Sequence, residues 1–158
     1  MRVLIVVALL LGAAGLTLGV VSILEEDDKE SQELALALTV EEGDFKVNDV
    51  APRATSEEDI SSGDSFVFTG AVSGDREGKL LGACDVADVG EPTCQVIYTF
   101  DDGDVTGAGI PGFSQQAESF QIAVTGGTGA YEGARGQVDV HENGKATHQM
   151  TLVLPGEN

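Results

Sequence analysis

The sequence predicts an all-β protein of the sandwich or barrel class, built from residues 34–154. Three observations support this prediction. Short strand-like segments recur at a spacing of about ten residues and are separated by Gly, Asp, Asn and Pro. Two of the joints, Asp102-Gly103 and Asn143-Gly144, consist of residue types that tolerate the positive φ values of a two-residue hairpin turn. Residues 126–136 contain five glycines, and helical patterning is absent after residue 33.

The first 24 residues are expected to form a separate apolar helix, either a signal peptide or an N-terminal membrane anchor. After Met1 and Arg2, residues 3–24 carry no charge, and the acidic run 25–28 follows. As a helix this segment is just long enough to span a hydrocarbon core of about 30 Å. Its glycines and a small-residue cleavage position after Ser22 favour a signal that is removed, so both alternatives stay open. Either one places the rest outside the cytoplasm: secreted, or membrane-anchored facing outside and touching the membrane only through residues 3–24.

The rest of the chain is strongly acidic. Residues 25–33 are charged and polar, and we expect an acidic linker there. Beyond residue 24 there are seven basic and 27 acidic side chains, which gives a formal charge of −20. Such a surface repels phosphate backbones and anionic lipids, so nucleic acid is not expected as a partner. The acidity is explained either by a solvated acidic coat or by adaptation to high salt, where screening weakens self-repulsion.

Eight strands are expected within the domain, each a run of strand-forming residues between turn residues. They cover residues 34–40 (a continuation through 45–48 is left open), 65–73, 79–86, 93–100, 105–110, 118–125, 131–141 and 145–154. Residues 49–63 form the one long irregular stretch, and residues 155–158 form a tail.

Alternation in residues 94–100 indicates how such strands are used. The three larger side chains of one face are Val96, Tyr98 and Phe100, and the other face carries Gln95, Ile97 and Thr99. Neither face is wholly polar. This pattern fits a small barrel whose lumen is filled by side chains or holds one apolar ligand, while part of its outer surface packs against another subunit.

Strand-like alternation stops at a cluster of five glycines and resumes after it. The glycines are Gly126, Gly127, Gly129, Gly133 and Gly136. A phosphate-binding loop of the G-x-G-x-x-G type would need glycine at position 132, which is Glu132, and a helix after it. Because β-type sequence follows, we expect a structural glycine corner, where positive φ and close backbone approach let an antiparallel sheet bend as it closes on itself. The sequence therefore predicts an eight-stranded antiparallel β-barrel preceded by the apolar N-terminal helix.

Two cysteines, Cys84 and Cys94, lie on either side of the expected turn 88–92. In an exported chain an even pair on facing strands predicts a disulfide, with a pair of free thiols as the alternative. A closed zinc site would need four ligands, and both histidines lie far along the chain. We expect no metal at these cysteines.

The two histidines flank the Asn143-Gly144 turn. A two-residue loop would pair His148 with Asp139 and His141 with Ala146, so we expect surface imidazoles beside a carboxylate, with a two-ligand metal site as the minor alternative. In the same way, residues 101–104 are expected to form an ordinary acidic hairpin turn, with calcium binding as the alternative.

Motifs for group-transfer chemistry are not found. The sequence contains no G-x-S-x-G nucleophile motif, and neither histidine has a serine or cysteine at a motif spacing. With eight aromatic residues and no Trp, a large aromatic pocket is not expected. We expect no bound cofactor.

Several segments together resemble the allene oxide cyclase barrel family, whose relatives include the dirigent proteins. They are residues 63–69 (GDSFVFT), 81–84 (LGAC), 96–100 (VIYTF) and 123–138 (AVTGGTGAYEGARGQV), with the glycine cluster as the specific part. The resemblance covers most of residues 34–154. It implies an eight-stranded barrel, often trimeric, with an apolar lumen in which a hydrophobic substrate is cyclised or coupled without a cofactor.

Individual positions both support and limit the resemblance. Asn48 and Phe68 match family positions, and Cys84 corresponds to a cysteine of the family's cavity. Lys46 stands where the plant cyclases have a glutamate, and Gly70 replaces an asparagine that helps to hold a water molecule. These departures argue against the plant cyclase reaction.

The functional hypothesis from sequence is cyclisation or isomerisation of a hydrophobic small molecule inside the barrel. The ligand-cavity candidates are Asn48, Phe68 and Tyr98. The alternative is a non-catalytic ligand-binding or structural barrel. In either case a homo-oligomer, by resemblance a trimer, is the expected assembly.

Overall fold

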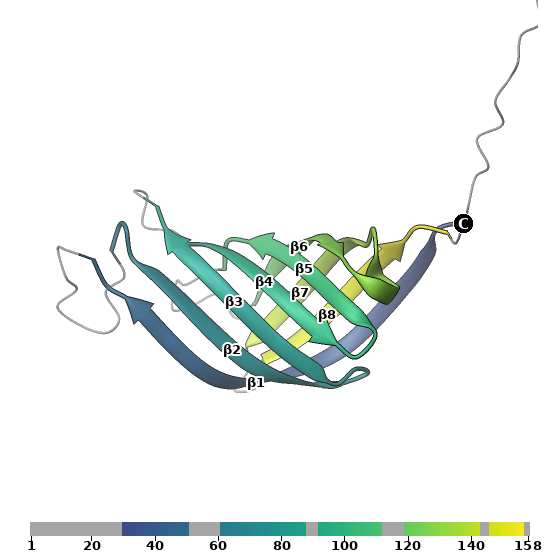
Figure 1. The fold of residues 1–158 in the computed structure, drawn as a ribbon, viewed down its shortest axis with the longest axis horizontal. Helices are drawn as coiled ribbons and strands as arrows, with labels where there is room; N and C mark the ends of the chain where they lie inside the picture. The colour runs from purple at the N-terminus through teal and green to yellow at the C-terminus, as the bar shows by residue number, and fades with distance from the viewer. Residues whose placement is uncertain (1–29, 51–60, 88–91, 112–118, 143–145, 157–158) are drawn as a thin grey trace, which may run out of the picture.

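The computed structural model describes residues 30–50, 61–87, 92–111, 119–142 and 146–156, which form eight strands and one short 3-10 helix, η1. Each strand is antiparallel to its neighbour in chain order, and β8 pairs back with β1, so the sheet closes into a barrel (Figure 1). The predicted eight-stranded antiparallel barrel is confirmed. The elements are β1 Gln32–Asn48, β2 Ser65–Gly74, β3 Gly78–Val86, β4 Pro92–Phe100, β5 Gly103–Gly109, β6 Ser119–Gly127, η1 Gly129–Tyr131, β7 Arg135–Glu142 and β8 Ala146–Leu154.

The N-terminal boundary differs from the expected one. β1 begins at Gln32 instead of Leu34, because Gln32 and the residue after it pair with the end of β8. The strand continues through Asn48, which was the open alternative. The expected apolar helix lies within residues 1–29, outside the described residues. The described residues contain no candidate membrane-spanning helix, since the one helical element among them, η1, has three residues.

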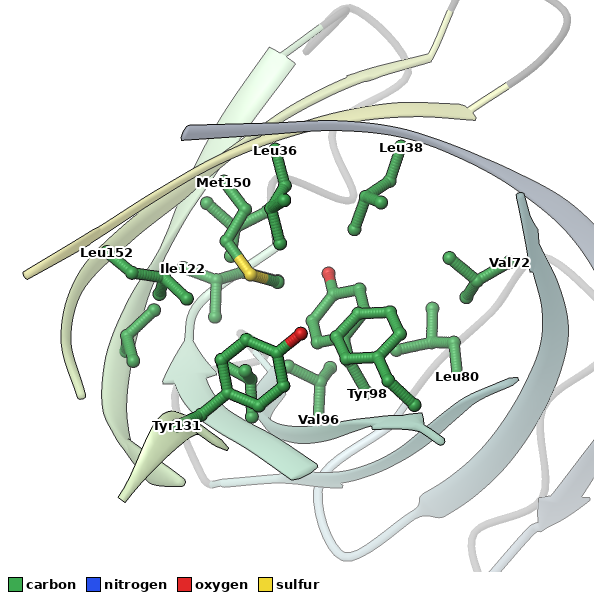
Figure 2. Close-up of a cluster of buried hydrophobic side chains, with 14 of the residues drawn as sticks. Leu36, Leu38, Val72, Leu80, Val96, Tyr98, Ile122, Tyr131, Met150 and Leu152 are labelled. Atoms are coloured by element: carbon green, nitrogen blue, oxygen red, sulfur yellow. The ribbon is translucent and has the colours of Figure 1, made fainter. Parts of the chain in front are cut away.

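Inward-facing side chains fill most of the barrel. β4 alternates as expected: Val96, Tyr98 and Phe100 are buried, and the residues between them are exposed. Figure 2 shows Val96 and Tyr98 pointing into the same interior as leucine side chains from β1 and the Met150 side chain from β8. Because burying each Val, Leu or Met contributes about 1.5–3 kcal/mol, this cluster is the main source of stability. Its buried members are Leu36, Leu38, Val40, Val72, Leu80, Val96, Tyr98, Phe100, Val105, Ile122, Val124, Tyr131, Ala134, Val138, Val140, Met150 and Leu152.

The glycine-rich segment closes one end of the barrel. After β6 the chain makes the 3-10 turn η1, which places Tyr131 inside the barrel at 1% exposure, with its ring centroid 5.6 Å from that of Phe100. The backbone N–H of Ala130 donates to the carbonyl of Asp102 (2.9 Å), which holds the turn against the end of the β4–β5 hairpin. Tyr131 therefore acts as a plug for this end.

This segment corrects one predicted boundary. The strand expected from Tyr131 begins at Arg135, because residues 129–131 are coiled into η1. Gly129 (φ 59°) and Gly133 (φ 73°) take the left-handed conformations that the turn requires, and Gly136 has φ 142°. Gly126 and Gly127 belong to β6 and are not at positive φ.

The turn between β4 and β5 also differs in detail. Phe100 pairs with Gly103, so the two loop residues are Asp101 and Asp102 instead of Asp102 and Gly103. Neither aspartate has positive φ, and Gly103 has φ 148°. The hairpin lies where it was expected, with its turn shifted by one residue.

The irregular stretch after β1 is attached to the barrel by Asp64. Its buried carboxylate accepts hydrogen bonds from the backbone N–H of Ser61 (2.7 Å) and of Val50 (2.9 Å). The bonds from Ser61 and Val50 hold the pKa of Asp64 below its usual value, since they favour the charged form. The intervening residues 51–60 lie outside the described part of the chain.

Candidate functional site

A cavity of about 290 Å³ lies at the end of the barrel opposite Tyr131. All eight strands contribute to it, most of them near the end of the barrel where β1, β5 and β7 finish. Its volume is close to the lower limit of about 300 Å³ for small-molecule pockets. It is lined by Val40, Glu42, Gly43, Asp44, Phe45, Phe66, Phe68, Thr69, Leu80, Cys94, Val96, Gly109, Pro111, Phe120, Ile122, Val140, Glu142, Ala146 and His148.

The inner wall of this cavity is apolar except for one imidazole. Buried Leu80, Val96, Ile122 and Val140 surround the inner part. His148 lies among them at 5% exposure. Neither of the alternatives considered for this histidine, a surface position or a metal site, describes its place in the structure.

The expected pairing of His148 is wrong by one residue. Glu142 pairs with Ala146, so the connection between β7 and β8 spans residues 143–145 and Val140, not Asp139, lies opposite His148. Successive residues of a strand face opposite sides, and this shift therefore turns His148 from the outer surface into the lumen.

The other two residues expected to pair across that turn, Asp139 and His141, also have different partners. His141 pairs with Thr147 instead of Ala146, and its side chain is exposed. Asp139 accepts a hydrogen bond from the side-chain amide of Gln121 at 2.6 Å, on the outer face of the barrel. The expected contact between Asp139 and an imidazole of residue 148 does not form.

His148 is hydrogen-bonded to Tyr98 across the lumen. Its Nδ1 lies 2.6 Å from the Tyr98 hydroxyl, and the two rings meet edge to face at a centroid distance of 5.8 Å. Burial lowers the pKa of His148 to about 4 and raises the pKa of Tyr98 above its ordinary value. Both groups are therefore uncharged at neutral pH.

The protons of this pair can be assigned from the hydrogen bonds available. The hydroxyl of Tyr98 has one proton and no other acceptor among the described residues, so it donates to Nδ1 of His148. A neutral imidazole then carries its proton on Nε2. His148 makes no second hydrogen bond within the described residues, and no polar side-chain atom there is both buried and without a partner. Nε2–H is consequently a donor that remains accessible from the cavity.

Three carboxylates lie at the outer part of the cavity, on the side formed by β1 and β7. Glu42 and Asp44 come from a bulge in β1, which is held by a hydrogen bond from the Asp44 backbone N–H to the Thr69 hydroxyl (3.0 Å). Glu142 comes from the end of β7. All three side chains are exposed, and they give the mouth a negative potential.

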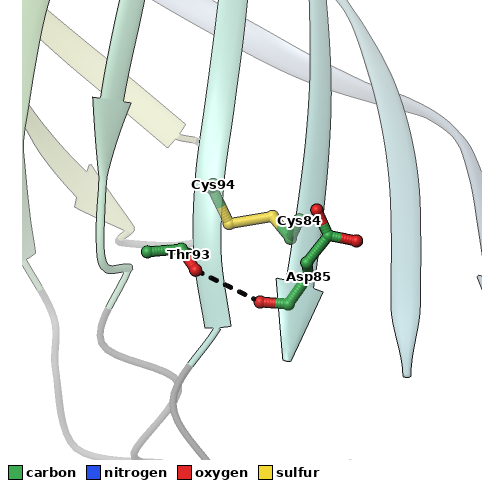
Figure 3. Close-up of a disulfide and its surroundings, with 4 residues drawn as sticks. All are labelled: Cys84, Asp85, Thr93 and Cys94. Atoms are coloured by element: carbon green, nitrogen blue, oxygen red, sulfur yellow. Dashed lines mark hydrogen bonds between the residues drawn. A yellow bond between two sulfur atoms is a disulfide. The ribbon is translucent and has the colours of Figure 1, made fainter. Parts of the chain in front are cut away.

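The predicted disulfide is confirmed. Cys84 and Cys94 lie directly opposite each other on β3 and β4 with their Cα atoms 4.1 Å apart (Figure 3). Both side chains are buried with Phe66 and Val86, and Cys94 forms part of the cavity wall. Cys84 therefore offers no free thiol to a ligand.

The structure brings two of the three ligand-cavity candidates close to the site. Phe68 lines the cavity, and Tyr98 lies beside it as the partner of His148. Asn48 is exposed at the end of β1, where its side-chain amide is 3.5 Å from the Ser65 hydroxyl. Lys46 is exposed and lies opposite Val67 on the outer face.

Sequence reasoning missed His148, although a signal was present. In residues 146–154 every second residue from His148 onward is apolar, through Met150, Leu152 and Leu154. Period-two alternation places His148 on that apolar face. The turn signal Asn143-Gly144 predicts the opposite face, because a two-residue loop there would pair His148 with Asp139.

No metal site emerges from the residues that the structure describes. No group of three or more His, Cys, Asp or Glu side chains in these segments could hold a metal ion. In the acidic turn 101–104, Asp102 lies 3.7 Å from the guanidinium of Arg76, and its carbonyl accepts the bond from η1.

A closed antiparallel barrel, plugged at one end and hollow at the other, places the chain among the small β-barrels that enclose a lumen. Its fold is similar to a pyocyanin demethylase (TM-score 0.62, 20% identity, 75% of this chain and 99% of that chain). It is also similar to a pterocarpan synthase dirigent protein (0.58, 14%, 82% and 87%) and to an exo-specific intermolecular Diels-Alderase (0.59, 12%, 78% and 98%). No family model and no curated protein matches the sequence. At these identities the likeness establishes the fold, and it confirms the expected dirigent-like barrel at that level.

Proposed function

We propose that the chain is an exported, cofactor-free barrel that binds a hydrophobic small molecule in this cavity and favours one cyclisation or isomerisation of it. The observation that carries the proposal is a mainly apolar cavity with a single buried imidazole, His148, at its inner wall. The fold likeness to a Diels-Alderase and to a dirigent protein supports it.

A cyclisation or isomerisation can proceed with the few polar side chains that line this cavity. A cyclisation or isomerisation transfers no group to or from a second substrate, so it needs the reacting atoms to be held close together in one conformation. Apolar walls from several strands can impose that conformation, and exclusion of water strengthens any hydrogen bond made inside.

Export is supported by two independent features. Residues 3–24 are uncharged and precede an acidic run. The Cys84–Cys94 disulfide is typical of an oxidising compartment, since cytoplasmic thiols are kept reduced. Expression of the full chain followed by cell fractionation and N-terminal sequencing distinguishes a cleaved signal from a retained anchor.

A barrel that binds its ligand without converting it is the second candidate. The outward position of Lys46 and the closure of Cys84 into a disulfide favour it, because neither group can serve chemistry in the lumen. This candidate predicts recovery of an unchanged ligand from the protein, whereas the first predicts a product related to its precursor by the same elemental composition.

The test begins with native mass spectrometry of the protein from its own host, followed by extraction and identification of the bound compound. The variant Ala146→Trp fills the cavity mouth and should abolish binding. Ala123→Trp places the same side chain on the outer face of β6 and should not. Equal binding by the wild-type protein and both variants would exclude the cavity as the site.

We also propose that copies of this barrel associate through its outer face. Leu81 and Ile97 lie opposite each other on β3 and β4, and both are exposed. Exposed apolar groups that lie side by side on a sheet face are typical of subunit contacts. Sedimentation velocity of the wild-type protein and of Ile97→Lys tests this: the variant should sediment as a smaller species.

A further inference from the structure

The inner wall and the mouth of the cavity carry different polar groups, and this difference limits which ligands it can bind. Its inner wall carries one uncharged donor, the Nε2–H of His148, and its mouth carries three carboxylates, on Glu42, Asp44 and Glu142. We propose that the site selects uncharged hydrophobic compounds with an acceptor oxygen, a carbonyl above all, and rejects carboxylates. This inference rests on the proposed ligand binding in the same cavity and names its substrate class.

The donor is the part that recognises the oxygen. His148 is 5% exposed, lines the cavity and makes its only hydrogen bond among the described residues through Nδ1. Tyr98 fixes the tautomer, because its hydroxyl proton occupies Nδ1 and leaves the ring proton on Nε2. An apolar ligand without an acceptor would leave this donor unpaired in a dry cavity, which costs binding free energy.

The mouth is the part that rejects anions. Glu42 and Asp44 approach from the β1 bulge and Glu142 from β7, so the carboxylates come from two separate strands. A ligand carboxylate would meet their repulsion on entry and would lose its hydration inside. The formal charge of −19 for the whole chain adds to this repulsion at low ionic strength.

A hydrogen bond at this position would also assist the proposed reaction. A donor aimed at a carbonyl oxygen stabilises negative charge that develops there during bond rearrangement. Because the pair is neutral, it polarises the carbonyl without transferring a proton.

Three matched probes test the selection by isothermal titration of the full exported chain. They are 2-acetylnaphthalene, 2-isopropenylnaphthalene, in which a CH₂ group replaces the carbonyl oxygen, and 2-naphthoate. We expect the ketone to bind about fivefold more tightly than the hydrocarbon, as one net hydrogen bond provides. We expect 2-naphthoate to bind at least about tenfold more weakly than the ketone at low ionic strength, with the difference narrowing as salt is added.

Variants assign each preference to its residues. The double change Tyr98→Phe and His148→Leu removes the donor without leaving the tyrosine hydroxyl unpaired, and the ketone should then lose its advantage over the hydrocarbon. The double change Glu42→Gln and Glu142→Gln should raise the affinity for 2-naphthoate relative to the affinity for the ketone. Difference infrared spectroscopy of the ¹³C-carbonyl ketone needs no variant, and binding to the wild-type protein should lower the carbonyl stretching frequency below its value in hexane.

The outcomes separate this inference from the proposed function. Equal affinity for ketone and hydrocarbon, or a carbonyl frequency equal to that in hexane, overturns the selection while leaving ligand binding intact. Tighter binding of 2-naphthoate than of the ketone overturns it equally. Failure of all three probes to bind overturns both the selection and the proposed ligand site.

Discussion

Reduction of the Cys84–Cys94 disulfide should destabilise the barrel by an amount that follows from its place in the chain. The bond joins residues ten positions apart. Closing a loop of that length removes chain entropy from the unfolded state equivalent to about 2.7 kcal/mol at 25 °C. For a domain of this size, that loss corresponds to a decrease in Tm of about 10 °C.

The bond lies where few other interactions can replace it. Between the disulfide and this end of the two strands, only two further residue pairs join β3 and β4. They are Asp85 with Thr93 and Val86 with Pro92. The buried neighbours in this region are Phe66 and Val86, a small cluster separate from the main core. Native packing of these strands therefore contributes little that would offset the greater entropy of the reduced unfolded chain.

Differential scanning calorimetry of three samples provides the measurement: the oxidised protein, the protein reduced with dithiothreitol, and the double variant Cys84→Ala and Cys94→Ala without reductant. Mass spectrometry should show two added hydrogens on reduction. The double variant should melt close to the reduced protein, which separates loss of the bond from effects of the reductant. A fully reduced protein that melts at the same temperature as the oxidised one would refute the reasoning, because the closed loop would then not constrain the unfolded state.

Three further changes probe the core, the glycine corner and the plug. Because burial lowers the pKa of His148 to about 4, the unfolded state binds a proton between pH 6.5 and pH 4 that the folded state does not bind. The free energy of unfolding should therefore fall by about 3 kcal/mol as the pH decreases over this range. Urea titrations over this range should show that loss in the wild-type protein and not in His148→Gln. Gly136→Ala should cost about 2 kcal/mol or more, since a Cβ there would overlap the Thr151 carbonyl oxygen and the residue has φ 142°. Gly126→Ala should be nearly neutral in the same assay, because a Cβ there would meet the Thr106 hydroxyl at 3.6 Å, an ordinary van der Waals distance. Tyr131→Ala should lower the free energy of unfolding by about 3–5 kcal/mol and open the closed end; a change below about 1 kcal/mol would mean that the plug is not part of the cooperative core.

The fold was largely accessible from the sequence because strand formation here is a local property. Alternation with period two, punctuated by turn residues, located all eight strands, and the facing positions of Cys84 and Cys94 followed from the hairpin between them. Local signals were weaker at the ends of strands. The predicted start of β7 was wrong because the sequence around Tyr131 is also compatible with a strand. In the structure residues 129–131 form η1 instead.

The candidate site was much less accessible, because it depends on register. In the expected register Met150 would share a face with Gln137. In the observed one, Val138 lies opposite Met150, and Gly136 lies opposite Leu152. Burial of apolar groups over the whole length of β7 and β8 outweighs the preference of a single Asn-Gly pair for a two-residue loop.

The sequence by itself determined an acidic chain of eight antiparallel strands with its two cysteines on facing strands, since composition and periodicity act within each segment. Only the tertiary structure decided that His148 faces Tyr98 inside the barrel, that carboxylates gather at one mouth, and that Tyr131 seals the other end. Each of these depends on how distant strands align, and a shift of one residue in a β-strand exchanges its inner and outer faces.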